Sequence, residues 1–144
     1  MAIRRGYTQP QAGLIGEART RKLFGTASLA LAVTDLNVAA AGNSVSAFIV
    51  PAGFTCTGIT LTNSDMDTAT ALLIAIGDSA VNNRLVASTA AFQSPGTISS
   101  LAATGLFYQF PIDTEILITT LTGAATAAAG TVTNFYLEGF VNNP

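Results

Sequence analysis

The stretch TVTNFYLEGFV at residues 131–141, near the end of the chain, decides the fold class. Its side chains alternate along an extended backbone. The residues on one face are Phe135, Leu137 and Val141, and those on the other face are Asn134, Tyr136 and Glu138. A period of two is typical of a strand with one buried face. The stretch therefore predicts a β-strand that closes the chain.

Residues 26–34, TASLALAVT, alternate in the same way. Further strands are expected where β-branched and aromatic residues lie between turn-forming residues such as Pro51-Ala52-Gly53. The expected strands are residues 26–34, 44–50, 54–62, 70–76, 84–90, 104–112, 115–121 and 131–141. This spacing predicts an all-β fold, an antiparallel β-sandwich that is jelly-roll-like, with about eight strands.

Some of these segments carry more specific signals. Gly58 interrupts the alternation of its strand and predicts a β-bulge. Residues 72–76 are apolar throughout, which predicts a strand buried on both faces. Residues 92–103 are expected to form a long loop, followed by an aromatic strand at 104–112.

The charge of the chain is divided unevenly. Residues 1–22 hold five Lys or Arg and one Glu, whereas residues 23–144 hold one Arg and seven Asp or Glu. Such asymmetry is typical of an interaction tail, and the Gly and Pro residues in the basic part discourage regular structure. We therefore expect an extended basic N-terminal arm at residues 1–24 and a β-sandwich body at residues 25–144.

The arm has few apolar side chains with which to anchor itself on its own body, so we expect it to lie on a neighbouring molecule. The apolar anchors are Ile3, Tyr7, Leu14 and Ile15. The residues expected to make the contact are Arg4, Arg5, Tyr7, Arg19, Arg21 and Lys22. The net charge of −2 and the acidic body argue against nucleic acid as the partner.

The composition excludes most catalytic and metal-binding chemistry. The chain has no His, so neither a Ser-His-Asp triad nor a His-ligated metal can be built. Its one cysteine, Cys56, lacks a His base and is interpreted as a buried or half-buried structural residue. We therefore expect no enzymatic activity, no cofactor, no metal and no small-molecule substrate.

Two acidic pairs are candidates for other chemistry. Asp65 and Asp67 offer oxygen ligands to a hard cation, but residues 69–70 do not supply the ligand and glycine that a calcium loop needs. That pair therefore predicts a polar turn. Asp113 and Glu115 project from one face of an extended chain. Nothing beside them supports acid–base catalysis, so they are interpreted as an exposed strand end.

The end of the arm and the residues after it imitate a secretion signal, because Arg19–Lys22 precede the apolar stretch Leu23–Val33. Thr26 and Ser28 within the stretch, and Asp35 after it, argue against that interpretation. No uninterrupted apolar stretch predicts a transmembrane helix, so no membrane partner is expected. A lone cysteine fits synthesis in a reducing cytoplasm.

Charged residues make up 10% of the chain, against about 25% in typical soluble domains. The 25 Ala and 20 Thr show that the surface is built largely of small and uncharged side chains. A free monomer with so little charge would tend to self-associate. Burial of that surface between subunits removes the hazard, so we expect a permanent oligomer within a larger assembly.

The chain resembles the small head decoration (cement) proteins and other minor structural proteins of tailed bacteriophages. The resemblance is carried by the arm Met1–Lys22, the strand entry Pro51-Ala52-Gly53-Phe54 and the closing strand around Phe135–Phe140. It implies a homotrimer at local three-fold positions on the outer surface of a capsid. It also implies that the trimer clamps neighbouring major capsid subunits, with the basic arm residues paired to acidic capsid residues.

Two alternatives stay open at this point. The chain could be another phage structural component, a tail or head-fibre protein, which would share the composition and differ in ring symmetry. A carbohydrate-binding β-sandwich is the second alternative. It needs an exposed aromatic platform, for which the candidates are Tyr108 and Tyr136.

Overall fold

The computed structural model describes residues 20–24, 28–32, 44–69, 71–123 and 129–141. These residues form nine strands and one short 3-10 turn, and no α-helix is present among them. The elements are β1 (Thr20–Phe24), β2 (Ser28–Ala32), β3 (Ser44–Val50), β4 (Phe54–Asn63), β5 (Leu73–Gly77), β6 (Val86–Thr89), η2 (Ala91–Gln93), β7 (Gly96–Ile98), β8 (Thr114–Thr122) and β9 (Ala129–Val141).

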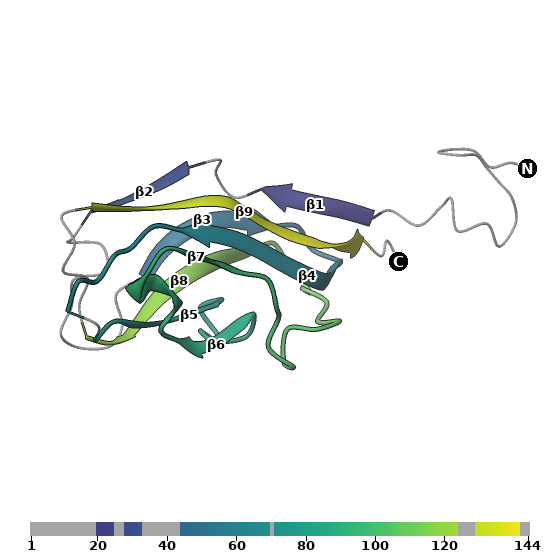
Figure 1. Ribbon diagram of the computed structural model, residues 1–144. Coiled ribbons are helices and arrows are strands. Elements are labelled where there is room, and N and C mark those ends of the chain that lie inside the picture. The colour runs from purple at the N-terminus through teal and green to yellow at the C-terminus, as the bar shows by residue number, and fades with distance from the viewer. Residues whose placement is uncertain (1–19, 25–27, 33–43, 70, 124–128, 142–144) are drawn as a thin grey trace, which may run out of the picture.

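The strands form two antiparallel sheets that stack as a sandwich (Figure 1). Sheet A has the order β1-β9-β4-β7, with β2 also paired to β9, and sheet B has the order β3-β8-β5-β6. β1 and β2 pair in succession along β9 and together fill one edge position. The chain crosses between the sheets at every connection except β1 to β2 and β5 to β6, which is jelly-roll topology. The predicted fold class is confirmed.

Strand β9 holds sheet A together, because it pairs with β1 and β2 on one side and with β4 on the other. The predicted alternation is confirmed: Phe135 and Leu137 are buried, whereas Asn134 is exposed. Phe135 also reaches across to sheet B, where the ring of Phe48 meets it edge-on with ring centres 5.1 Å apart. Such aromatic pairs add to the stability gained from burial.

The core fills the space between the two sheets with aliphatic and aromatic side chains. Sheet A and sheet B both contribute fully buried residues, including Phe54, Leu61, Val132, Ile74, Ile76, Ile116 and Ile118. Val, Ile, Leu and Phe pack well on a pleated surface, which is why these segments form strands. One core holds the sandwich together.

Two specific expectations from the sequence are confirmed. The pairing of β4 with β9 shifts register between Cys56 and Gly58, where the β-bulge was expected. In β5, Ile74, Ala75, Ile76 and Gly77 are all buried, as an apolar run with no polar face requires. The expected strand at 70–76 therefore lies slightly later in the chain, at Leu73–Gly77.

The predicted long loop at 92–103 is wrong, because this segment contains β7 and the end of η2. Pro95 precedes β7, and Thr97 and Ile98 then pair with Thr62 and Leu61 at the end of β4. The three-residue strand is too short to give a period-two signal in the sequence. It forms because β4 offers a free edge at this end.

The predicted aromatic strand at 104–112 is also wrong. The segment makes a single bridge, between Gln109 and Thr55, after a turn near Gly105. Phe107 has φ 61°, a left-handed conformation that interrupts an extended strand and is strained for an aromatic residue. Backbone hydrogen bonds from Phe107 and Phe110 to β4 still hold the segment against sheet A. Of its aromatic side chains, Phe110 is buried in the core, whereas Phe107 is exposed.

Gly139 in β9 marks the closest approach within sheet A. A Cβ at this position would overlap the carbonyl oxygen of Thr55 and the ring of Phe54. A Cβ at Gly58, also at the β4–β9 seam, would make only an ordinary contact with Glu138, at 3.4 Å. Gly139 therefore lets β4 and β9 approach where no other residue would fit.

We expect Gly139→Ala to destabilise the protein by about 3 kcal/mol, because overpacking in a tight site costs about 1–3 kcal/mol or more. The matched control Gly58→Ala is expected to change stability by less than about 1 kcal/mol. Urea denaturation of the purified variants measures both values. Equal effects of the two substitutions would contradict this account of the seam.

Candidate functional site

The residues of the predicted arm contact are divided between the described and undescribed parts of the chain. Arg4, Arg5, Tyr7 and Arg19 lie outside the described residues. Arg21 and Lys22 belong to β1, where their backbones pair with Gly139 and Glu138 of β9. The last five residues of the predicted arm, Thr20–Phe24, therefore add a strand to the edge of sheet A.

The acidic turn at Asp65 and Asp67 forms an internal hydrogen-bond network. The buried Asp67 carboxylate accepts backbone N–H bonds from Ala69, Ala71 and Leu72, the last two at 2.6 Å. Asp65 accepts from the N–H of Asp67 at 2.9 Å. Backbone donors satisfy a buried carboxylate without a metal, so this turn is a structural element that leads into β5. No group of three or more Asp, Glu or Cys side chains able to hold a metal occurs among the described residues.

The second acidic pair lies where β8 begins. Asp113 and Glu115 are both exposed. Asp113 accepts a 2.9 Å hydrogen bond from the N–H of Ala52 and so ties the turn between β3 and β4 to the start of β8. The structure therefore gives Asp113 a bracing role.

An ion pair with an aromatic neighbour lies between the loop at 78–84 and the segment at 104–112. Arg84 Nε donates to Asp78 Oδ2 at 2.5 Å, and both side chains are largely buried. The guanidinium carbon of Arg84 lies 3.8 Å from the ring centre of Tyr108. Tyr108 in turn meets Phe110 edge-on at 5.0 Å. The Tyr108 ring is thus engaged by Arg84, which argues against its use as an open sugar-binding platform.

The ion pair also sets the charge state of Asp78. Burial alone would raise the pKa of this carboxyl, but the hydrogen bond and charge of Arg84, together with backbone N–H groups of Ala80 and Val81, lower the pKa below its ordinary value. The folded state therefore favours the ionised carboxylate.

Large apolar side chains are exposed at two places. Leu106 and Phe107 lie on the segment beside β4, and Phe107 is 67% exposed despite its strained backbone. Ile49 at the end of β3 and Ile112 just before β8 are 63% and 68% exposed. An exposed aromatic residue held in an unfavourable conformation is costly in a free monomer. These residues are candidates for contact with another molecule.

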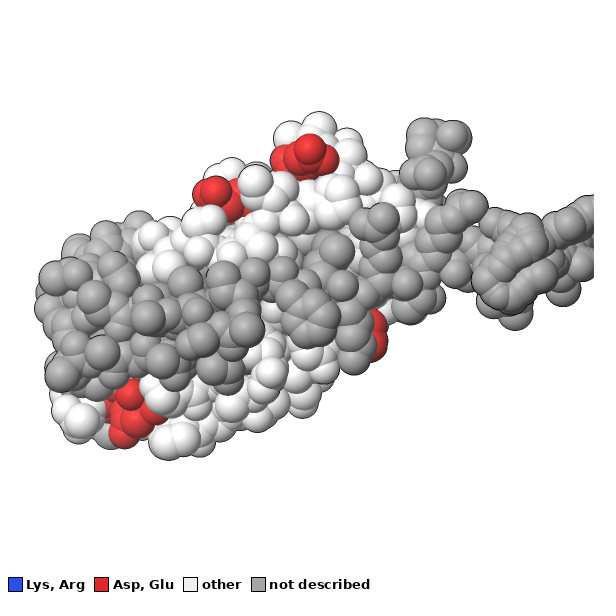
Figure 2. Space-filling model, turned by 90° about the horizontal axis from the view of Figure 1, so that it is seen from above, with Lys and Arg blue, Asp and Glu red and all other residues white. Residues whose placement is uncertain are grey.

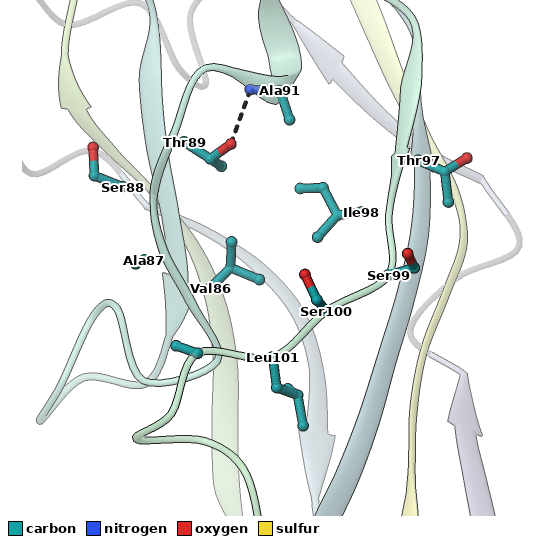
Figure 3. Close-up of a pocket in the computed structure, with 11 residues that line it drawn as sticks. Val86, Ala87, Ser88, Thr89, Ala91, Thr97, Ile98, Ser99, Ser100 and Leu101 are labelled. Atoms are coloured by element: carbon teal, nitrogen blue, oxygen red, sulfur yellow. Dashed lines mark hydrogen bonds between the residues drawn. The ribbon is translucent and has the colours of Figure 1, made fainter.

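A cavity of about 430 Å³ opens between β6 of sheet B and β7 of sheet A. Val86 and Ile98 point toward each other across it (Figure 3). Hydroxyl groups of Ser88, Thr89 and Ser100 also line it, and Thr89 Oγ accepts a hydrogen bond from the N–H of Ala91. None of the lining residues is charged or aromatic. The lining of the cavity is therefore uncharged, with hydroxyl groups beside apolar side chains.

The cavity belongs to a longer uncharged side of the sandwich, which we call the open side: β6, η2, β7 and the chain to Ile112. Residues 85–112 contain no Lys, Arg, Asp or Glu. Figure 2 views another face, from above β1, β2 and β9; there too the acidic groups stand apart among uncharged described residues, and no described Lys or Arg is visible. Sequence reasoning missed this surface, although a run of 28 residues without charge was available as a signal.

Among the described residues, no helix is long and apolar enough to cross a membrane.

Buried Cys56 donates its thiol to the carbonyl of Gly58 at 3.5 Å, and burial raises the pKa of the thiol to about 11. The interpretation of Cys56 as a buried residue is confirmed.

No protein-family model and no curated protein matches the chain. Solved structures do share its fold. A chain in the cyanophage Pam1 capsid asymmetric unit superposes with a TM-score of 0.67, at 21% identity, over 87% of this chain and 86% of that one. A chain in the capsid of Ralstonia phage GP4 gives a TM-score of 0.61, at 17% identity, over 94% of this chain and 90% of that one. The jelly roll described above is therefore a fold also found in chains of phage capsids.

We expect Asp78→Asn to destabilise the protein by about 3 kcal/mol at pH 7, because it leaves Arg84 buried without its counter-ion. Since folding lowers the pKa of Asp78, its contribution is present above the ordinary carboxyl pKa and is lost as the pH falls through the folded-state value. The difference between wild type and Asp78→Asn should therefore shrink from pH 7 to pH 3 in urea denaturation. Asp113→Asn, which changes an exposed carboxylate, is the control. A pH-independent difference would contradict this role of Asp78.

We expect the thiol of Cys56 to react with a disulfide reagent at pH 8 at least roughly 100-fold more slowly in the folded protein than in urea. A pKa near 11 leaves little thiolate, and burial blocks access. Absorbance of the released thiol chromophore measures both rates. Reaction at the unfolded rate in native buffer would show that β4 opens readily.

Proposed function

We propose that this protein is a structural component of a phage virion that binds the outer surface of the capsid and stabilises it. In this proposal it acts as a homotrimer that clamps neighbouring major capsid subunits. It is made in the host cytoplasm and carries out no reaction. The observation that carries the proposal is the jelly roll, which superposes along most of its length on chains of two phage capsids.

The chemistry of the surface supports the same function. The described body offers neutral, hydroxyl-rich strands and exposed apolar side chains such as Phe107 and Ile112. Surfaces of this kind suit permanent interfaces, which are more apolar than transient ones. Many weak contacts, repeated over many copies on a capsid, give strong attachment by avidity.

A tail or head-fibre protein remains a second candidate, since it would share the composition. A carbohydrate-binding role has less support, because Arg84 lies over the ring of Tyr108 and the cavity is lined by no aromatic residue. The capsid proposal is favoured because both superposed chains come from capsids.

The proposal is tested on phage capsids produced without this protein. Purified full-length protein is added, and cryo-electron microscopy measures its occupancy on the capsid surface. We expect density at regular positions over the seams between capsid subunits, and a higher temperature of DNA release. Density on the tail or head fibres with none on the capsid would favour the second candidate and contradict the capsid proposal.

Neutralising the basic arm should weaken attachment while the body stays folded. We expect Arg4, Arg5 and Arg19, all changed to Gln, to reduce binding to capsids by about 1–3 kcal/mol per copy, because exposed ion pairs contribute about 0.2–1 kcal/mol each. The loss should shrink at high salt, where such pairs are screened. Co-sedimentation with capsids at two salt concentrations measures it.

The control separates the arm from the sheet. Arg21 and Lys22 lie in β1, opposite Gly139 and Glu138, so their change to Gln is tested as a separate variant with thermal unfolding alongside. Attachment that is unaltered in both variants, at low and high salt, would remove the arm from the binding surface.

A further inference from the structure

The open side of the sandwich exposes the outer edges of two strands. β6 is the last strand of sheet B and β7 is the last strand of sheet A. Within the part of the chain that the structure describes, neither strand forms a ladder on its outer side, and the nearest backbone contact is the N–H of Ala102 donating to the carbonyl of Leu85, just before β6. The backbone N–H and C=O groups of a free edge are a template for pairing with another strand.

This edge lacks the charge that usually prevents such pairing. Natural proteins protect free edges with Lys and other charged residues, and with short strands or bulges. β6 and β7 are short, but residues 85–112 carry no charge at all. Instead they expose Leu106 and Phe107 and enclose the cavity over Val86 and Ile98. An uncharged edge with exposed apolar side chains is better suited to contact another protein surface than to face water.

The same chain supplies a matching edge on the other side of the sandwich. β3 is the first strand of sheet B and pairs only with β8 among the described residues. It lies within residues 36–64, which are also uncharged. Ser44, Ser46 and Ile49 of β3 are exposed. The opposite edges of sheet B are thus alike in chemistry.

The topology also gives these edges the right directions. All pairs in sheet B are antiparallel, and the order is β3-β8-β5-β6. With four alternating strands, β3 and β6 run in opposite directions. A second copy related by rotation about an axis parallel to the strands therefore brings its β3 alongside β6 in antiparallel orientation. Such a head-to-tail contact repeats around the axis and closes into a ring.

We propose that copies of this chain associate through the open side, with β6 of one copy paired to β3 of the next so that sheet B continues from subunit to subunit. A second copy is the occupant that fits, because it supplies an uncharged edge of the right direction, with Ser44 and Ser46 exposed on it. This inference adds a contact surface to the proposed function. It takes the number of copies in the ring from that proposal. It places the self-association surface at the edges of the sandwich rather than on its faces.

The test uses the full-length chain with three exposed Ser residues changed one at a time to Lys. Ser88→Lys charges β6, Ser46→Lys charges β3, and Ser79→Lys, in the loop at 78–84, is the matched control. Native mass spectrometry and light scattering measure the oligomer, and thermal unfolding confirms the fold. We expect an oligomer for the wild type and the control. Each edge variant should raise the dissociation constant at least tenfold.

A charge-swap variant tests the pairing itself. Combining Ser88→Lys with Ser46→Glu places opposite charges across the proposed contact, and we expect it to restore the oligomer that Ser88→Lys alone disrupts. Because a Lys that simply unfolded β6 would not be rescued from β3, this result identifies the partner strand. Loss of the oligomer in Ser88→Lys but not in Ser46→Lys would overturn the pairing of β6 with β3.

The outcomes also separate this inference from the proposed function. A wild-type protein that stays monomeric at micromolar concentration, yet binds capsids, overturns the inference and the proposed homotrimer and leaves the capsid role in place. An oligomer with the expected edge dependence that binds no capsid overturns the capsid role and supports the inference. An oligomer that is indifferent to Lys at both edges also overturns the inference, whatever its capsid binding.

Discussion

The close approach of β4 and β9 is the constraint on which the rest of the sandwich depends. β9 pairs with β1, β2 and β4, so it joins both ends of the chain to the centre of sheet A. At Gly139 the space that a side chain would need is taken by the backbone of Thr55 and the ring of Phe54. Phe54 can then be fully buried, and the segment that follows η2 and β7 can hydrogen bond along the start of β4.

A few buried polar side chains hold the loops in place through hydrogen bonds and one ion pair. Asp67 accepts three backbone N–H bonds ahead of β5. Asn63 donates its amide to the carbonyls of Ala91 and Ser94, which holds the loop before β7 against the end of β4. Arg84 joins Asp78 to Tyr108 across the irregular segment. These contacts fix loops where strand pairing is absent, because buried polar groups need partners.

The scarcity of charge links the fold to the function we propose. A body with so few charged side chains cannot protect its sheet edges in the usual way. The same feature leaves neutral strands and exposed apolar side chains free to contact other subunits. In the function we propose, assembly into a larger structure thus depends on this one property of the composition.

Local patterns were enough to predict several elements and failed for others. The stretches at 44–50, 54–62, 115–121 and 131–141 became β3, β4, β8 and β9 nearly as expected, because each is long enough to show one buried face. β7 has three residues and exists only because β4 offers it an edge. The aromatic run at 104–112 reads as a strand, but Phe107 turns left-handed and its neighbours pack on β4 instead.

The candidate site, too, was predictable from the sequence only in part. The sequence by itself determined the all-β class, the buried Cys56, the polar turn at Asp65 and the absence of His, since these depend on composition and period-two patterns. Only the tertiary structure decided the strand order, the seam at Gly139, the Asp78–Arg84–Tyr108 contact and the open side. These features bring together residues far apart in the chain. Their geometry is set by how two sheets pack, which no local pattern encodes.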